Sequence, residues 1–399
     1  MEKQLLISPA KRTEQVQEYY FSQKLQQIEE MGRNGANVIN LGIGSPDMPP
    51  APGVIEALSK ASNQAGNHGY QSYIGIPALR TAFAKWYENH FDVTLNPANE
   101  ILPLMGSKEG IMHISMAFVN KGDEVLIPNP GYPAYESVTR LIGGKVRYYD
   151  LLEENAWLPD LDQLEEEGLE SVKLMWLNYP HMPSGTKGSA ELFTKLVAFA
   201  KRNRILLCND NPYSFILNTD TQSILAVEGS KDVALELNSL SKSHNMAGWR
   251  MGMIAGNSEY IKAILRVKSN MDSGMFQPLQ AAAVEALSAP QSWYTELNAL
   301  YLKRRKIAEQ IMQLLGCSYD KKQSGLFLWG KIPSEYKTGE ELTEQLLQDT
   351  HVFITPGFIF GSNGKRFIRI SLCSKEEVLL ESLERINQYL QENRLSKSA

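Results

Sequence analysis

Short apolar runs that alternate with helical patterns constrain the fold of this chain more than any other feature of its sequence. Helical stretches such as 107–118, 190–203 and 260–268 separate runs that are typical of buried strands. The runs are EVLIP from Glu124, KVRYYD from Lys145, KLMWLN from Lys173, ILLCND from Ile205, VALELNS from Val233 and MGMIAG from Met251. This alternation predicts an α/β fold with a mainly parallel sheet sandwiched by helices.

The pattern changes after about residue 290. A long polar helix expected at 293–315 is followed by the run GLFLWGKI, another helix, the run FIRISL and a last helix. Near the N-terminus we expect an amphipathic helix over residues 13–31, then an irregular loop in NLGIGSPDMPPAPG. We therefore predict a large domain at residues 45–289 and a smaller α/β domain made of residues 1–44 and 290–399.

Composition argues against several classes of protein. The 399 residues are 43% apolar and 21% charged, as in soluble globular proteins, and a net charge of −5 without a basic block disfavours nucleic acid and membrane surfaces as partners. Cys208, Cys317 and Cys373 form no CxxC pair, so we expect buried thiols in a reducing compartment. The N-terminus lacks the apolar core of a signal peptide, and we expect a cytoplasmic protein.

The segment SLSKSHNMAGWRMG is the most informative stretch for chemistry. Lys242 follows a predicted strand and is surrounded by Ser, Asn, His and Gly. A desolvated lysine has a lowered pKa and can form a Schiff base with an aldehyde. Ser239 and Arg250 flank it with a hydroxyl and a guanidinium, which both suit a phosphate. For this segment alone, a surface lysine beside a structural arginine is the alternative.

A second segment, MGSKEGIMH, places Gly106, Ser107 and Lys108 where a strand passes into a helix. The backbone N–H groups and the positive end of the helix dipole then point at one spot, which suits a phosphate. The alternative is a serine N-cap after a tight glycine turn.

A third segment, LLCNDNPY, ends a strongly apolar strand with Asp210, and Tyr213 follows. Ligands of open α/β sheets bind at this carboxyl edge, where a carboxylate can hold a ring nitrogen protonated. The alternative is an aspartate that caps a helix. A second arginine, Arg369 in RFIRIS, completes a set of a lysine, a phosphate cradle, an acid and a cation.

In this order and these contexts the residues resemble the class I/II aminotransferases of pyridoxal phosphate (PLP) fold type I, from about Leu41 to Ser371. The most specific element is S-x-S-K followed by G-W-R. The resemblance implies that Lys242 forms the Schiff base with PLP and moves a proton between the substrate Cα and the cofactor C4′. The residues implied to bind the phosphate are Gly106, Ser107, Lys108, Ser239 and Arg250.

The resemblance also implies the other contacts of the cofactor and the substrate. Asp210 would pair with the pyridine nitrogen, and Arg369 would hold the substrate's α-carboxylate near the backbone of Gly44. The other implied cofactor contacts are the stacked ring of Tyr132, Asn178, and the hydroxyl of Tyr213. Tyr70, in GYQSYIG, matches a tyrosine that reaches the phosphate of the neighbouring subunit, which implies a homodimer with shared active sites.

One position departs from the family pattern N-x-P-x-N-P-[ST]-G. Here the stretch reads NYPHMPSG, and Met182 stands where the family has the asparagine that contacts the phenolic oxygen and the substrate carboxylate. A thioether is a weak acceptor and cannot donate a hydrogen bond. We therefore expect a higher pKa for the Schiff base than in relatives with asparagine, with His181 as a candidate substitute for the missing contact.

The implied reaction transfers the amino group of an L-amino acid to a 2-oxo acid, with 2-oxoglutarate expected, by a ping-pong mechanism in amino acid metabolism. The alternatives are a PLP-dependent carbon–sulfur β-lyase, which would release pyruvate and ammonia from a cysteine conjugate, and a non-catalytic PLP-binding sensor. The chain has no added basic helix-turn-helix segment, which a sensor fused to a DNA-binding region would carry.

The donor amino acid is open. The stretches KSNMDSGMFQ and GSKEG are similar to a branch named for aspartate, alanine or LL-diaminopimelate. An acidic substrate side chain would need a second cation, for which Lys24, Lys108 and Arg266 are candidates. We expect no metal, because the other histidines show no spacing that places two ligands on one face; these are His68, His90, His113, His244 and His351.

Overall fold

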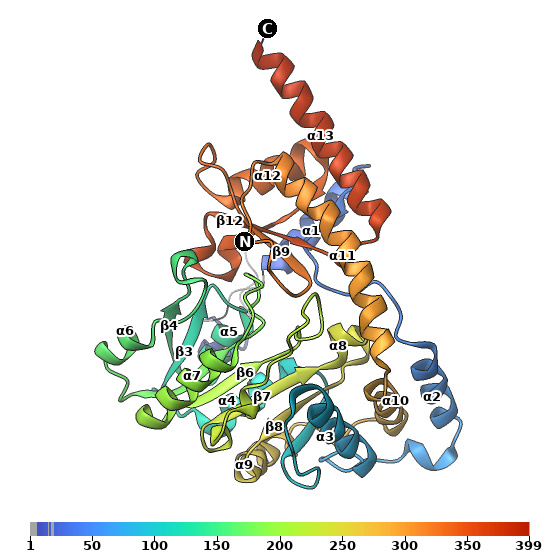
Figure 1. Ribbon diagram of the computed structural model, residues 1–399, viewed down its shortest axis with the longest axis vertical. Coiled ribbons are helices and arrows are strands. Elements are labelled where there is room, and N and C mark those ends of the chain that lie inside the picture. Colours follow the sequence, from blue (N-terminus) through green and yellow to red (C-terminus); the bar gives the residue numbers. More distant parts are fainter. Residues whose placement is uncertain (1–5, 15, 17–19, 399) are drawn as a thin grey trace.

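A seven-stranded sheet dominates the computed structural model, which describes residues 6–14, 16 and 20–398. Its strand order is β2-β8-β7-β6-β5-β3-β4, and every neighbouring pair is parallel except those that involve β8. The strands are β2 (Ile101–Leu104), β3 (Glu124–Asn129), β4 (Lys145–Asp150), β5 (Val172–Leu177), β6 (Leu206–Asp210), β7 (Ala234–Ser239) and β8 (Gly252–Gly256). The predicted α/β class with a mainly parallel sheet is confirmed (Figure 1).

Each of the six apolar runs forms a strand, whereas β2 was not among the predicted strands. This strand has only four residues, ILPL, and Pro103 interrupts its β-forming pattern. A proline removes one ladder hydrogen bond and is tolerated on an edge strand, where β2 lies.

Helices cover both faces of the sheet. One face packs against α4 (Ser107–Phe118), α5 (Ala134–Leu141) and α9 (Ser258–Lys268). The other packs against α3 (Pro77–Phe91), α7 (Ala190–Asn203) and α10 (Gln277–Leu287), and α2 (Pro52–Ser62) packs on α10. In β5, Leu174 and Trp176 face the first group and Met175 and Leu177 the second. Burial of both faces explains why the strands are continuous apolar runs.

Elements from the two ends of the chain form a smaller part above the sheet in Figure 1. Its antiparallel sheet consists of β9 (Phe327–Lys331), β11 (Thr355–Pro356) and β12 (Phe367–Ser371). Its helices are α1 (Tyr20–Arg33), α11 (Gln291–Leu314), α12 (Gly339–Thr350) and α13 (Glu376–Ser398). Residues 15 and 17–19, within the helix expected at 13–31, lie outside the described residues.

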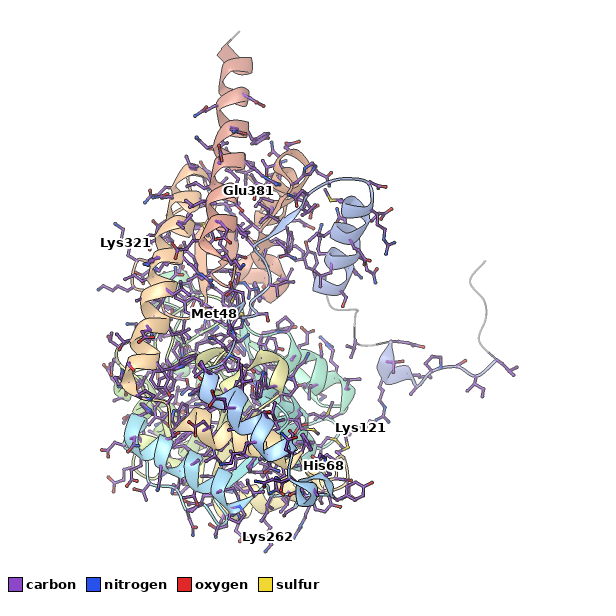
Figure 2. All side chains as sticks on the ribbon, turned by 90° about the vertical axis from the view of Figure 1, so that its right-hand side faces the viewer. Met48, His68, Lys121, Lys262, Lys321 and Glu381 are labelled. Atoms are coloured by element: carbon purple, nitrogen blue, oxygen red, sulfur yellow. The ribbon has the colours of Figure 1, made fainter. Side chains whose placement is uncertain are left out.

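The N-terminal segment joins this smaller part, because β1 (Ile39–Asn40) pairs with β10 (Val352–Phe353). In Figure 2, Glu381 marks the smaller part and His68 the large one, and Met48 lies at the level between them. Domain boundaries at residues 45 and 290 stay a prediction. No helix among the described residues is both long enough and apolar enough to cross a membrane.

Parallel pairing brings the carboxyl ends of β3, β5, β6 and β7 to one edge of the sheet. The irregular loop at 41–51 crosses between the two parts near this edge, and α11 holds it. Arg304 of α11, which is 3% exposed, pairs bidentately with Asp47 at N–O distances of 2.7 and 2.8 Å. A fixed loop therefore lies where open α/β sheets bind ligands.

A fully buried carboxylate ties the strands together beneath that edge. Glu236 of β7 accepts hydrogen bonds from Tyr87 Oη at 3.0 Å, Ser223 Oγ at 2.7 Å, Asn209 Nδ2 at 2.9 Å and the Ile224 N–H at 3.2 Å. Asn209 Oδ1 in turn accepts a hydrogen bond from the backbone N–H of Tyr179, at 3.1 Å. Burial raises the pKa of Glu236, but four donors offset part of the cost of its charge.

We predict that Glu236→Ala lowers the free energy of unfolding by about 3 kcal/mol or more, since each stranded buried donor costs about 1–3 kcal/mol. Glu236→Gln should cost much less. Its amide oxygen can face Asn209 and Ile224, and its NH₂ can donate to the two hydroxyls, which also accept. Urea unfolding of the three proteins measures both effects, and equal losses for Gln and Ala would contradict this account.

Candidate active site

A cavity of about 460 Å³ opens at the carboxyl edge of the large sheet, which is the usual size of a small-molecule site. The wall includes eleven of the residues singled out in the sequence: Gly44, Ser107, Lys108, Tyr132, Asn178, Asp210, Tyr213, Ser239, Lys242, Arg250 and Arg369. Gly106 adjoins this wall at the start of α4. Gly44 and Arg369, which are 325 positions apart in the chain (369 − 44), are thus brought to one site.

Lys242 lies in the short helix α8 (Leu240–Ser243), directly after β7. Its ammonium donates a hydrogen bond to the carbonyl of Gly44, in the loop that crosses the edge. Burial lowers the pKa of Lys242, and the positive charges of Arg369 and Arg250 lower it further. A larger share of this side chain is therefore a neutral amine, which is the nucleophilic and basic form.

Asp210, at the end of β6, offers an incompletely satisfied carboxylate. Tyr135 Oη donates to its Oδ2 at 3.1 Å, while Oδ1 is buried without a hydrogen-bond partner among the described residues. Burial raises the pKa of Asp210 to about 7. A cationic N–H group at Oδ1 would supply the missing bond and favour the ionised form.

Tyr135 is a functional residue that the sequence analysis missed. It stands in the first turn of α5, three residues after Tyr132, and stacks on Trp176 of β5 with ring centroids 4.9 Å apart. Tyr132 itself meets Tyr135 edge to face at 5.6 Å. The spacing in GYPAYE was the available signal, but it does not show that the second tyrosine turns toward Asp210.

Donors for an anion converge at the start of α4. Gly106 has a left-handed backbone (φ 87°), and no side chain caps the helix, so its first N–H groups face the cavity edge. A Cβ atom at Gly106 would lie 2.1 Å from Nη2 of Arg250, so only glycine permits this approach. Ser239 Oγ and Lys108 complete a cradle suited to a phosphate.

Arg369 of β12 also lines the cavity. Its Nη2 donates to the Gly42 carbonyl at 2.8 Å, and its Nη1 lies 3.3 Å from the sulfur of Met182. The guanidinium carbon lies 3.8 Å from the ring centre of Phe327 and 4.5 Å from that of Phe360. Cation–π contacts with two rings fix the guanidinium at this position, and neither phenylalanine was found from the sequence.

The residues around Met182 have other partners than the sequence suggested. His181 contacts Ser184 Oγ at 2.7 Å and the Pro130 carbonyl at 3.1 Å, and burial lowers its pKa to about 4. Because both ring nitrogens are engaged and the ring is not part of the cavity wall, His181 does not replace the missing asparagine. Asn178 lines the cavity, but its amide bonds the backbones of Asp210 at 2.5 Å and Met182 at 2.8 Å.

Four other candidates are now placed. Tyr70 is 93% exposed and outside the cavity wall. Of the cations considered for a second substrate charge, Lys24 pairs with Glu344, Arg266 is exposed on α9, and Lys108 lies in the wall.

The raised pKa of Asp210 predicts a pH dependence of stability in the ligand-free protein. Between about pH 4 and pH 7 the folded state keeps a proton that the unfolded state has lost, so the free energy of unfolding falls as pH rises. Asp210→Asn should show a smaller fall across this window. Thermal unfolding at about pH 5 and about pH 7.5 tests this; Glu236 acts in the same direction in both proteins, so an unchanged fall in Asp210→Asn would contradict the assignment.

Comparisons with known proteins agree with this geometry. The family model of aminotransferase class I and II matches residues 36–386. The LL-diaminopimelate aminotransferase of Aquifex aeolicus is 40% identical over 92% of this chain and 95% of its own length. That of Nitratidesulfovibrio vulgaris is 38% identical over 90% and 92%, respectively.

Solved structures agree as well. Apo-BacF of Bacillus subtilis superposes with a TM-score of 0.92 at 38% identity, covering 96% of this chain and 98% of its own. A probable N-succinyldiaminopimelate aminotransferase of Thermus thermophilus gives 0.85 at 31%, covering 92% and 99%. The chain therefore belongs to the class I and II aminotransferases, PLP-dependent enzymes that transfer an amino group between an amino acid and a 2-oxo acid.

Proposed function

We propose that Lys242 is the catalytic base of this aminotransferase and that the cavity binds PLP between Asp210 and the start of α4. The observation that carries the proposal is the position of Lys242, in one cavity with an unsatisfied carboxylate, an anion cradle and Arg369. These groups match the pyridine nitrogen, the phosphate and a substrate carboxylate. The residues present thus fit the cofactor.

The holding residues follow from their chemistry. Asp210 Oδ1 would pair with the protonated ring nitrogen, and Tyr135 would keep the carboxylate oriented through Oδ2. Ser107, Ser239 and Arg250 would hold the phosphate together with the first N–H groups of α4. When bound, PLP supplies an electron sink that stabilises negative charge at the substrate Cα.

Lys242 would move the protons. Its Nζ would accept the proton from the substrate Cα, which requires the neutral amine that burial favours. The ammonium formed in this way would be the donor of the proton needed at C4′. Arg369 binds the α-carboxylate, because its guanidinium is already oriented by two aromatic rings. Tyr213 would hold the phenolic oxygen of the cofactor through its hydroxyl, and Met182 would leave one donor fewer there.

The relatives provide the first donor to test. Those at 38–40% identity are named LL-diaminopimelate aminotransferases, and 2-oxoglutarate is the acceptor that we propose. The carbon–sulfur β-lyase is the competing reaction on this scaffold, because it begins with the same proton transfer to Lys242.

We also propose a homodimer in which Tyr70 completes the partner's phosphate site. Tyr70 is exposed and outside the cavity wall of its own chain. Three other large apolar side chains, Tyr73, Met271 and Phe276, are exposed as well. A second copy would bury such a surface.

Single amino acids added to the PLP-loaded enzyme without an oxo acid should convert the bound cofactor to its amine form, seen in its absorbance spectrum. Lys242→Ala should abolish this conversion, because it removes the amine proposed to accept the Cα proton. Lys262→Ala, on the exposed side of α9, is the matched control and should convert normally. Pyruvate released from a cysteine conjugate, without formation of the amine form, would favour the lyase instead.

Mixing two impaired variants tests the shared site. Tyr70→Ala and Lys242→Ala should each lose activity, and a mixed dimer should regain one native site that combines Lys242 from one subunit with Tyr70 from the other. Reassociation after mild denaturation should therefore restore activity. Restoration that fails although mixed dimers form would contradict a shared site.

A further inference from the structure

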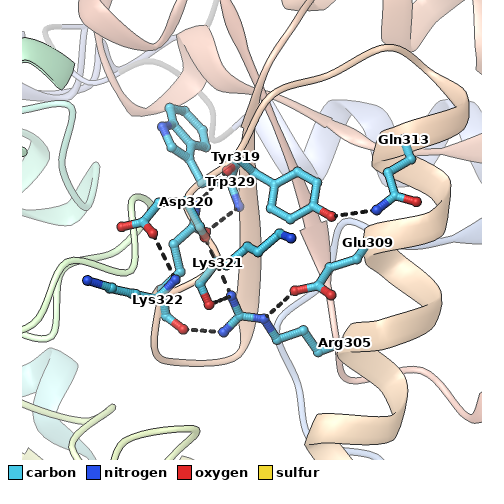
Figure 3. Close-up of polar contacts among 9 residues, drawn as sticks. Arg305, Glu309, Gln313, Tyr319, Asp320, Lys321, Lys322 and Trp329 are labelled. Carbon is cyan, nitrogen blue, oxygen red and sulfur yellow. Dashed lines mark hydrogen bonds and ion pairs between the residues drawn. The ribbon is translucent and has the colours of Figure 1, made fainter.

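A loop at residues 320–326, here called the junction loop, leads to Phe327 in the cavity wall, and none of the loop's own residues lines the cavity. Arg305 of α11, which is 7% exposed, anchors this loop through its carbonyls (Figure 3). Its guanidinium donates to the carbonyls of Lys321 at 2.7 Å and Gln323, and its Nε donates to Glu309 at 3.0 Å. One planar guanidinium group thus fixes two carbonyls of the loop to the helix.

The end of the junction loop is equally constrained. The amide of Gln323 donates to the carbonyl of Trp329 at 2.7 Å and accepts its N–H at 2.9 Å. Gln323 is 5% exposed, so these bonds are shielded from water. The loop is therefore tied to α11 on one side and to β9 on the other.

The same loop docks on two turns of the large part that carry site residues. The backbone N–H and the hydroxyl of Ser324 both donate to the Gly185 carbonyl, at 2.9 and 3.1 Å, and Gly185 closes the turn that contains Met182. The Gly325 N–H donates to Ile216 at 2.8 Å, in the turn that follows Tyr213. A Cβ atom at Gly185 would lie 2.7 Å from Cβ of Gln323, which shows how closely the surfaces meet.

The residue that follows the junction loop contacts Arg369. Phe327, which begins β9, lies under the Arg369 guanidinium at 3.8 Å and meets Tyr213 edge to face at 6.0 Å. A Cβ atom at Gly44 would lie 2.2 Å from the same phenyl ring. Any shift of the loop would therefore move the group against which Arg369 is placed.

From these contacts we infer that Arg305 is a positioning residue for amino acid binding: it holds the junction loop so that Phe327 orients Arg369. Arg305 lies outside the cavity wall and acts only through the loop. The inference rests on the proposed function, because it takes Arg369 as the group that binds the substrate carboxylate.

Replacement of Arg305 by lysine keeps the charge but not the planar fork that bonds several carbonyls. Arg305→Lys should raise KM for the amino donor by about tenfold or more, with a smaller effect on kcat and no change in the Kd of PLP. Glu309→Gln is the matched control: it alters only the Nε partner and should leave KM unchanged. Ser324→Ala removes one loop contact and should raise KM in the same direction by a smaller factor.

A double-mutant cycle shows whether the effect passes through Phe327. The KM increases of Arg305→Lys and Phe327→Leu should be clearly less than multiplicative when combined, because both disturb one orientation of Arg369. Multiplicative effects would overturn the inference, as would a lowered Tm of Arg305→Lys with an unchanged KM. Arg369→Lys distinguishes a failure of the proposed function from a failure of this inference. If Arg369→Lys leaves KM unchanged, the proposed role of Arg369 in substrate binding fails, whatever the effect of Arg305→Lys.

Discussion

The parallel pairing of β3, β5, β6 and β7 is the constraint on which the site depends. Because these strands run in one direction, their carboxyl ends meet, and the residues that follow them share one edge. Asp210 and Ser239 are the last residues of β6 and β7. Just before these positions, Asn209 of β6 donates to Glu236 of β7. Asn209 also accepts the N–H of Tyr179, which follows β5, so the three strand ends are fixed to each other.

The cavity buries ionisable groups of both signs, and one carboxylate oxygen, Asp210 Oδ1, has no hydrogen-bond partner among the described residues. The raised pKa of Asp210 and the lowered pKa of Lys242 both follow first from burial, which penalises each charged form. Such a site is costly to keep empty and gains from a ligand that supplies opposite charges. PLP, with a ring nitrogen and a phosphate, supplies both.

Two adjacent arginines of α11 join the smaller part to this site. Successive residues of a helix point about 100° apart, and Arg304 and Arg305 accordingly hold different loops. Arg304 fixes the loop that carries Gly44, and Arg305 fixes the junction loop before Phe327. Gly44 of the first loop accepts a hydrogen bond from Lys242, and Phe327, which follows the second loop, contacts Arg369. The positions of Lys242 and Arg369 therefore both depend on one helix.

The sequence by itself determined the α/β class, the strands with continuous apolar runs, and many of the polar and charged residues in the cavity wall, because local periodicity and short motifs carry that information. Lys242, Asp210 and Arg369 were recognised from their motifs, although they are far apart in the chain. Only the tertiary structure decided that Tyr135 contacts Asp210, that Met182 lies against Arg369, and that Phe327 and Phe360 enclose it. Tyr135 and Asp210 lie 75 positions apart and Met182 and Arg369 lie 187 apart, and the direction of these side chains depends on packing, which no local pattern encodes.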